Sequence, residues 1–227
     1  MTTSIIVLAK NPAVGEVKTR LAPALGLDGA CRFYRALMVR TLDVLANYPA
    51  ARRIWCYSGP MDAEICAHLD RRILCAPQKG EGLGPRMHDA LDEALKHTEK
   101  AILIGADCPE LNAAYLAQAE AVLAAGNDLV FGPSHDGGYV LVGVQRTCPD
   151  IFSGITYSRP DVLRKTILRV AALRRPSGAG YSSALLPALN DIDEPCDLRA
   201  WASRAPAEVA EFMRGAGLSN ADGTTSW

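Results

Sequence analysis

Residues 4–23 have the sequence Ser4-Ile-Ile-Val-Leu-Ala-Lys-Asn-Pro-Ala-Val-Gly-Glu-Val-Lys-Thr-Arg-Leu-Ala-Pro23. The run from Ile5 to Ala9 is apolar and rich in β-branched residues, which predicts a β-strand. Turn-forming residues follow at once, and two cations, Lys18 and Arg20, stand in an otherwise apolar stretch. In an extended segment their spacing would put both side chains on one side, where they could span a triphosphate. A strand leading into a loop with backbone amides and fixed cations is suited to bind phosphate. The segment predicts a nucleotide site, although an ordinary strand-to-helix loop with two surface cations would show the same pattern.

Two common phosphate-binding motifs do not match this loop. A Walker A motif has a glycine directly before its lysine, whereas Val17 precedes Lys18 in this sequence. A dinucleotide-binding fingerprint has the pattern G-x-G-x-x-G after the first strand, and this loop offers only Gly15. The loop therefore belongs to a third kind of site, which the rest of the chain must identify.

The composition is that of a globular enzyme of 227 residues, with 49% hydrophobic and 22% charged residues. A net charge of -1 gives no basis for bulk attraction to nucleic acid or membranes. The seven cysteines are odd in number and contain no C-x-x-C pair, which argues against a disulfide framework or a zinc ribbon. No apolar run approaches the ~20 residues of a membrane span, and no signal peptide is expected before the first strand. A cytoplasmic location is predicted, and the oligomeric state stays open.

Strand-like and helix-like segments alternate along the chain, which predicts an α/β sheet with helices on both faces. Ligands of such sheets bind beyond the carboxyl ends of the strands. A single domain is expected over 1–215 and a polar tail over 216–227. Predicted strands are 5–9, 54–57, 73–76, 101–105, 129–131, 139–144 and 185–186, and predicted helices are 29–48, 61–70, 85–97, 112–125, 160–173 and 197–214.

Acidic residues follow two of the predicted segments. Asp107 comes directly after the buried strand 101–105, where a carboxylate is placed to bind magnesium, or to cap the next helix. In the sequence Asp191-Ile-Asp193, both carboxylates point to one side if the segment is extended. Either Asp191 or Asp193 could complete a metal site with Asp107, or the pair could mark a helix N-terminus.

A glycine-containing loop joins the strands 129–131 and 139–144 and has the sequence Gly132-Pro-Ser-His-Asp-Gly-Gly-Tyr139. Its glycines would let a substrate approach the backbone while Ser134 and Asp136 contact it. An ordinary hairpin turn has the same residues, so this motif alone is weak.

Together these motifs resemble those of a bacterial transferase family with the nucleotide-diphospho-sugar transferase (GT-A) fold. Its members are often labelled radical-SAM/selenodomain-associated glycosyltransferases, and 2-phospho-L-lactate guanylyltransferase is a more distant relative. The resemblance runs from residue 4 to about 203 and implies a three-layer, Rossmann-like α/β fold with a mostly parallel mixed sheet. It is carried by Lys10–Pro23, Pro77-Gln78, Leu83-Gly-Pro-Arg-Met87, Gly105-Ala-Asp-Cys-Pro109, Gly132–Tyr139 and Asp191-Ile-Asp-Glu-Pro195.

The resemblance also implies roles for individual residues. Asp107 would hold Mg²⁺ or Mn²⁺ with help from Asp193, and with Lys18 and Arg20 it would form the catalytic set. Gly82 and Glu194 depart from the family pattern, which leaves the base and the second metal ligand open. Residues implied to bind nucleotide are Ala9, Lys10, Pro12, Gly15, Lys18, Gln78 and Gly84, and those implied to face the acceptor are Ser134, Asp136, Gly137, Gly138 and Tyr139.

Three functions are consistent with these features. The first is Mg²⁺-dependent nucleotidyl transfer from a nucleoside triphosphate to a small acceptor with release of pyrophosphate, a reaction that needs positioning and charge neutralisation. The second is glycosyl transfer from an NDP-sugar, in which Asp136 would orient the acceptor. The third is a nucleotide-binding protein without turnover. No nucleic-acid partner is expected, and the sequence names neither the acceptor nor the nucleobase.

Overall fold

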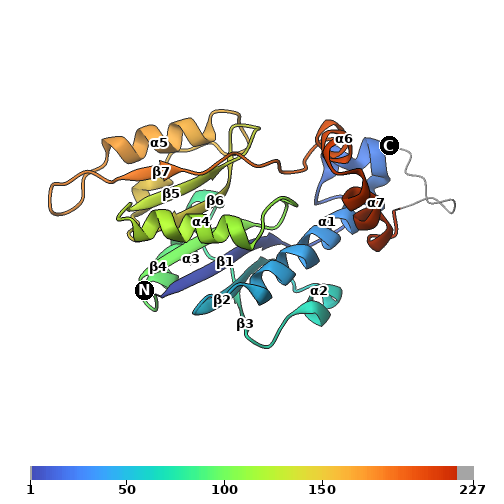
Figure 1. Cartoon of the computed structure of the whole chain (residues 1–227), viewed down its shortest axis with the longest axis horizontal. Coiled ribbons are helices and arrows are strands. Elements are labelled where there is room, and N and C mark those ends of the chain that lie inside the picture. Colours follow the sequence, from blue (N-terminus) through green and yellow to red (C-terminus); the bar gives the residue numbers. More distant parts are fainter. Residues whose placement is uncertain (1, 219–227) are drawn as a thin grey trace.

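The computed structural model describes residues 2–218, and its centre is a seven-stranded sheet with the strand order β3-β2-β1-β4-β6-β5-β7 (Figure 1). Strands β3, β2, β1 and β4 are mutually parallel, β6 runs antiparallel to both β4 and β5, and β7 is parallel to β5. The strands are β1 (Thr3–Lys10), β2 (Arg52–Ser58), β3 (Ile73–Pro77), β4 (Lys100–Gly105), β5 (Leu129–Pro133), β6 (Tyr139–Val144) and β7 (Ser183–Leu185). The predicted α/β class and mostly parallel mixed sheet are confirmed.

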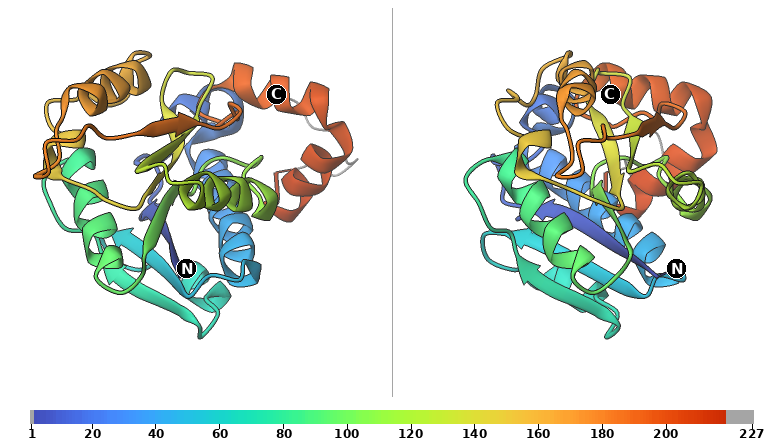
Figure 2. Two further views of the ribbon diagram at one scale, coloured as in Figure 1. Left: turned by 60° about the vertical axis from the view of Figure 1, so that its left-hand side comes forward. Right: turned by 90° about the vertical axis from the view of Figure 1, so that its left-hand side faces the viewer.

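Helices cover both faces of the sheet, as Figure 2 shows. Alternation along β1 sends Ile5 and Val7 into one core with α1 and α4, and Ile6 into the other core with α3 and α5. Three layers result. The helices are α1 (Ala22–Asn47), α2 (Ala63–His68), α3 (Leu83–Leu95), α4 (Ala113–Ala124), α5 (Val162–Ala172), α6 (Pro195–Arg204) and α7 (Pro206–Gly215), with 3₁₀ turns η1 (Thr19–Leu21) and η2 (Pro149–Ile151).

A third apolar cluster joins the two ends of the chain. Phe33 and Leu37 of α1 pack with Trp201 of α6 and Met213 of α7. This cluster holds the segment before α6 against the loop that follows β1. It therefore fixes two distant parts of the sequence at one edge of the sheet.

Two helix predictions differ from the structure. The first helix begins at Ala22, before the predicted start at 29, and it breaks at Gly26, whose φ is +70°. The predicted helix 197–214 is two helices, because Pro206 cannot donate the backbone bond that would continue α6 through Ala205. Residues 219–227 of the predicted tail lie outside the described residues.

All seven cysteines are free. Among residues 2–218, no helix is long and apolar enough to cross a bilayer.

Candidate functional site

A cavity of about 650 Å³ opens at the carboxyl ends of the central strands. The loop after β1 lines it, as does Asp107, just after β4. Asp191 and Asp193 come from the segment before α6, and Asp136 comes from the loop between β5 and β6. Four separate segments thus bring charged side chains to the edge of the sheet where ligands of α/β folds bind.

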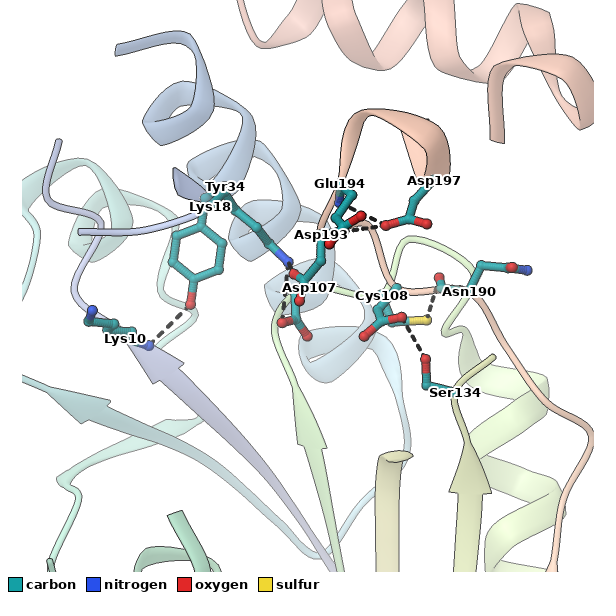
Figure 3. Close-up of polar contacts among 11 residues, drawn as sticks. Lys10, Lys18, Tyr34, Asp107, Cys108, Ser134, Asn190, Asp193, Glu194 and Asp197 are labelled. Carbon is teal, nitrogen blue, oxygen red and sulfur yellow. Dashed lines mark hydrogen bonds and ion pairs between the residues drawn. The ribbon is translucent and has the colours of Figure 1, made fainter. Parts of the chain in front are cut away.

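Lys18 is the residue around which this site is built (Figure 3). Its ammonium donates to Asp107 Oδ2 at 3.4 Å and also to Asp193 Oδ1, and its side chain is only 5% exposed. Burial lowers the pKa of Lys18, but the carboxylates of Asp107 and Asp193 raise it by more. The pKa is therefore above its ordinary value, and the buried ammonium stays charged.

The local backbone explains how a lysine reaches this position. Lys18 has a φ of +46°, in the left-handed region, and the 3₁₀ turn η1 begins at the next residue. This geometry contradicts the extended segment on which Lys18 and Arg20 were expected to share one side. The side chain of Arg20 is 62% exposed and lies 3.6 Å from Glu194 Oε1. Both cations still line the cavity, with one buried and one at the surface.

Asp107 is not the cap of the helix that follows β4. Asn112 takes that role, since its side chain accepts from Tyr115 N at 3.1 Å and α4 begins one residue after it. A Cβ at Gly105 would stand 2.7 Å from Asp107 Oδ1, so the glycine leaves room for the carboxylate beside the end of β4. The interpretation of Asp107 as a site residue is thereby favoured over that of a helix cap.

The segment before α6 presents alternate side chains to opposite sides, as predicted. Ile192 is fully buried in the third apolar cluster, whereas Asp191 and Asp193 line the cavity. Asp197 holds the turn by accepting from Asp193 N at 3.0 Å and from Glu194 N at 2.7 Å. The same turn therefore starts a helix and supplies two carboxylates.

Asp191 is hydrogen-bonded to the loop between β5 and β6. Its Oδ1 accepts from the buried hydroxyl of Ser134 at 2.5 Å. Burial raises the pKa of Asp191 to about 6, the Ser134 hydrogen bond opposes that rise, and the nearby carboxylates of Asp136, Asp107 and Asp193 add to it. Ser134 does not line the cavity, so the structure places it behind Asp191.

The predicted acceptor loop borders the same cavity through Asp136, Gly138 and Tyr139. Asp136 Oδ1 accepts from Gly138 N at 2.7 Å, which closes a tight turn. The other oxygen of Asp136 has no hydrogen-bond partner among residues 2–218.

Gly137 does not line the cavity itself, and it packs against the segment before α5. Its φ is +90°, and a Cβ on it would stand 2.0 Å from the carbonyl oxygen of Pro160. Its own carbonyl accepts from Leu163 N at 2.9 Å. Only glycine fits this contact, which joins the loop to the segment carrying Tyr157 and Arg159.

A second cavity of about 380 Å³ adjoins the first and is lined by Ala9, Lys10 and Gln78. Lys10 donates from its backbone N to Tyr34 Oη at 3.1 Å and from Nζ to Glu16 O at 2.7 Å. These three predicted nucleotide residues therefore lie together beside the carboxylates.

Lys18 lines the first cavity, and the three remaining predicted nucleotide residues, Pro12, Gly15 and Gly84, line neither cavity. Pro12 turns its carbonyl toward α1, where it accepts from Arg35 Nη2 at 3.1 Å. Gly15 lies on the open loop with a φ of +80°. Gly84 is packed against Phe152, whose carbonyl oxygen would stand 2.6 Å from a Cβ at this position. The roles of these three residues stay predictions.

The donor set at the carboxylates suits magnesium or manganese. Among the described residues 2–218, no group of three or more His, Cys, Asp and Glu side chains is arranged to hold a metal ion. Asp107 and Asp193 instead share one ammonium. Magnesium commonly uses one or two carboxylates and takes its other ligands from substrate phosphates and water, whereas a structural zinc site needs four protein ligands.

Sequence reasoning missed several residues of the cavity wall. Tyr34 on α1 lies beside both cavities, and burial, followed by the charge of Asp107, raises its pKa to about 12. Tyr157 and Arg159 come from the irregular segment between η2 and α5. Tyr34 lies within the predicted helix 29–48, and no motif marked it, Tyr157 or Arg159 as a site residue.

The sequence matches the model of one described protein family. Residues 41–159, a little over half of the 227 residues, match the family described as "Uncharacterized protein conserved in bacteria (DUF2064)", and the chain belongs to this family. No curated protein sequence matches the chain.

Several solved structures have a fold similar to that of this chain. The chain is similar to the "putative nucleotide-diphospho-sugar transferase from Desulfovibrio desulfuricans G20", with 29% identity, 95% of each chain covered and a TM-score of 0.81. CMP:2-keto-3-deoxy-manno-octonic acid synthetase complexed with CTP has 9% identity, a TM-score of 0.55, and coverage of 92% of this chain and 100% of its own. Rv0371C from Mycobacterium tuberculosis H37Rv in complex with manganese has 15% identity, a TM-score of 0.50, and coverage of 88% and 97%. The fold is that of nucleotide-diphospho-sugar transferases and cytidylyltransferases, and the 29% identical structure supports a place for the chain in this transferase superfamily.

Proposed function

We propose that this protein is a divalent-cation-dependent nucleotidyltransferase. The acceptor oxygen would attack the α-phosphorus of a nucleoside triphosphate, the bond from that phosphorus to the β-phosphate would break, and pyrophosphate would leave. The observation that carries the proposal is the buried Lys18 ammonium, which bonds Asp107 and Asp193 at the edge of the 650 Å³ cavity.

The charges around the cavity suit a triphosphate. Lys10, Lys18, Arg20 and Arg159 all line it. Phosphoryl chemistry depends mainly on positioning and on neutralising charge, which these cations supply. Asp107 and Asp193 would hold Mg²⁺ or Mn²⁺, and when bound the cation would neutralise charge on the phosphate oxygens. The CTP and manganese complexes of the fold relatives support this class of ligand.

Glycosyl transfer from an NDP-sugar is the second candidate, and one observation favours it. Asp191 reaches the wall near Asp136, so two carboxylates from different segments border the same part of the cavity. Such a pair could bind sugar hydroxyls or accept a proton from an acceptor. The 29% identical relative is named for sugar-nucleotide transfer, which is consistent with this alternative.

The experiment that separates the candidates measures the leaving group. The protein is incubated with Mg²⁺ and each nucleoside triphosphate in the presence of phosphorylated and hydroxylated small acceptors, and pyrophosphate is assayed. In parallel, NDP-sugars are supplied and free NDP is assayed. Acceptor-dependent pyrophosphate supports nucleotidyl transfer. Acceptor-dependent NDP without pyrophosphate from any triphosphate would overturn it in favour of glycosyl transfer.

A further inference from the structure

The stretch from Arg159 to Arg175, which contains helix α5, is strongly basic. It holds six of the 24 lysines and arginines of the chain and a single acidic residue, Asp161. The other 24 of the 25 acidic residues lie elsewhere, so the remainder of the chain is net negative. The positive charge is therefore concentrated in one segment, although the chain as a whole has a net charge of -1.

The outer face of α5 is open to solvent. Val162, Thr166 and Val170 are buried and hold the helix on the sheet. Arg164 and Leu168 lie one turn apart on the other side, with side chains 71% and 58% exposed. Figure 1 and Figure 2 show α5 at the periphery of the fold, with this side turned away from the sheet. Leu168 is the most exposed large apolar side chain among residues 2–218.

Several cations of this segment are not neutralised by the fold. Within residues 2–218, the side chains of Arg159 and Arg169 form no hydrogen bond or ion pair, and that of Arg174 donates only to backbone carbonyl oxygens. Lys165 and Arg175 have aspartate partners, at 2.9 Å and 3.2 Å. The face therefore keeps a surplus of positive charge that a negatively charged partner can neutralise.

Exposed leucines on this face distinguish between two kinds of negatively charged partner. Leu185 of β7 is 52% exposed and pairs with Phe131, whose side chain belongs to the core on the α5 side, so Leu185 and α5 share one face of the sheet. A lipid bilayer accepts exposed leucines at its interface as well as cations. Nucleic-acid surfaces commonly add aromatic side chains, and the segment 159–175 contains none. These features favour a bilayer.

We infer that the outer face of α5 docks this protein reversibly on an anionic lipid bilayer. Each cation held near such a surface strengthens binding by roughly fivefold, and Leu168 adds to this by inserting among the lipids. Arg159 and Pro160 also line the 650 Å³ cavity, so docking would bring the rim of that cavity to the bilayer. The inference goes beyond the proposed function and does not depend on it.

The test is cosedimentation of the whole chain with lipid vesicles. Vesicles of phosphatidylcholine with about a third phosphatidylglycerol should bind the wild type at least about tenfold more strongly than vesicles of phosphatidylcholine alone. Added salt should weaken the binding, because it screens the charges. The variant R164Q/R169Q should lower the partition coefficient by about tenfold or more, since it removes two cations. L168Q should lower it by about threefold or more, since the inserted apolar group is lost.

The variant R71Q/R199Q is the matched control, because it removes the same charge from two exposed arginines outside α5. It should bind anionic vesicles as the wild type does. The inference would be overturned if the wild type bound neither kind of vesicle or both equally, or if the two double variants bound anionic vesicles equally. Binding to a labelled DNA duplex without binding to vesicles would assign the face to nucleic acid and would also overturn it. The wild-type comparison decides the matter even if a variant does not fold.

Discussion

The buried ammonium of Lys18 bonds the carboxylate of Asp193, although 175 positions separate the two residues in the sequence. The bond joins the loop after β1 to the segment before α6, and Asp107 after β4 is its third member. Charges this close in a partly buried place interact strongly, and the two carboxylates keep the buried ammonium of Lys18 charged. The same three groups are therefore expected to link folding, cation binding and phosphate binding.

Replacing Lys18 with Met should have opposite effects on stability and on cation binding. The free energy of unfolding should fall by about 1–3 kcal/mol, because two carboxylates lose their partner but remain 40% and 44% exposed to solvent. Binding of Mn²⁺ without nucleotide should tighten, because ammonium and cation compete for the same oxygens. Urea unfolding and electron paramagnetic resonance measure the two effects. The control is K96M, since Lys96 pairs with Asp92 and Glu93 at the surface. Weaker Mn²⁺ binding in K18M would contradict the competition.

The same Lys18 variant tests contact with phosphate. Affinity for a nucleoside triphosphate should fall by more than affinity for the corresponding nucleoside, because only the former carries charge for the ammonium to neutralise. Calorimetry with both ligands gives the two losses. Equal losses would mean that Lys18 shapes the cavity without contacting phosphate.

Asp107→Asn should remove most of the Mg²⁺ dependence of nucleotide binding while changing the free energy of unfolding by only about 1 kcal/mol. Asparagine keeps the size of the side chain and loses the charge that a hard cation requires. Asp193 would still pair with Lys18, which limits the effect on folding. Nucleotide titrations with and without Mg²⁺ provide the measurement, with D92N on the exposed side of α3 as the control. An unchanged Mg²⁺ dependence would show that Asp107 serves only the fold.

The strands were predictable because their signal is local. Ile102 and its neighbours in β4 are buried on both faces, and a continuous apolar run is the direct mark of such a strand. The alternation of Asp191 and Asp193 around the buried Ile192 was equally visible in the sequence. These features depend on residues near one another in the chain.

The partner of Lys18 could not be predicted in this way. The prediction assumed an extended backbone, whereas the left-handed φ of Lys18 and the turn η1 separate its side chain from that of Arg20. Nothing local to the loop indicates that a lysine will be buried against carboxylates from other segments. The segment that carries Asp193 is held beside the loop by the packing of Trp201 and Met213 against α1, and this packing is a tertiary contact that no local pattern records.

Gly137→Ala should destabilise the protein more than Gly126→Ala. Both glycines have a positive φ, of +90° and +98°, so both substitutions incur backbone strain of about 1 kcal/mol. Only at Gly137 would the new Cβ meet backbone, at 2.0 Å from Pro160 O, whereas nothing lies within 4 Å at Gly126. A further loss of roughly 2 kcal/mol is expected from that clash. Urea unfolding of both variants measures the difference, and equal losses would mean that the loop moves freely away from Pro160.

Asp191→Asn should raise stability at neutral pH and have little effect in mild acid. The pKa of Asp191 in the folded protein is about 6, against an ordinary value of 3.8, because of burial first and neighbouring carboxylates second. The folded state therefore binds this proton more tightly than the unfolded state does. The resulting stabilisation is fully present below about pH 4 and is lost as the pH rises through about 6. Asparagine does not ionise, so its advantage over the wild type should grow across that interval, by roughly 1–3 kcal/mol.

Urea unfolding of wild type and Asp191→Asn, measured without divalent cations between about pH 4 and pH 7.5, gives this difference directly. Ser134→Ala supplies a second arm. Its hydroxyl donates to Asp191 and favours the ionised form, so its removal should raise the pKa further and move the loss of stability to higher pH. A difference between wild type and Asp191→Asn that stays constant with pH would show that Asp191 ionises as it does in the unfolded chain.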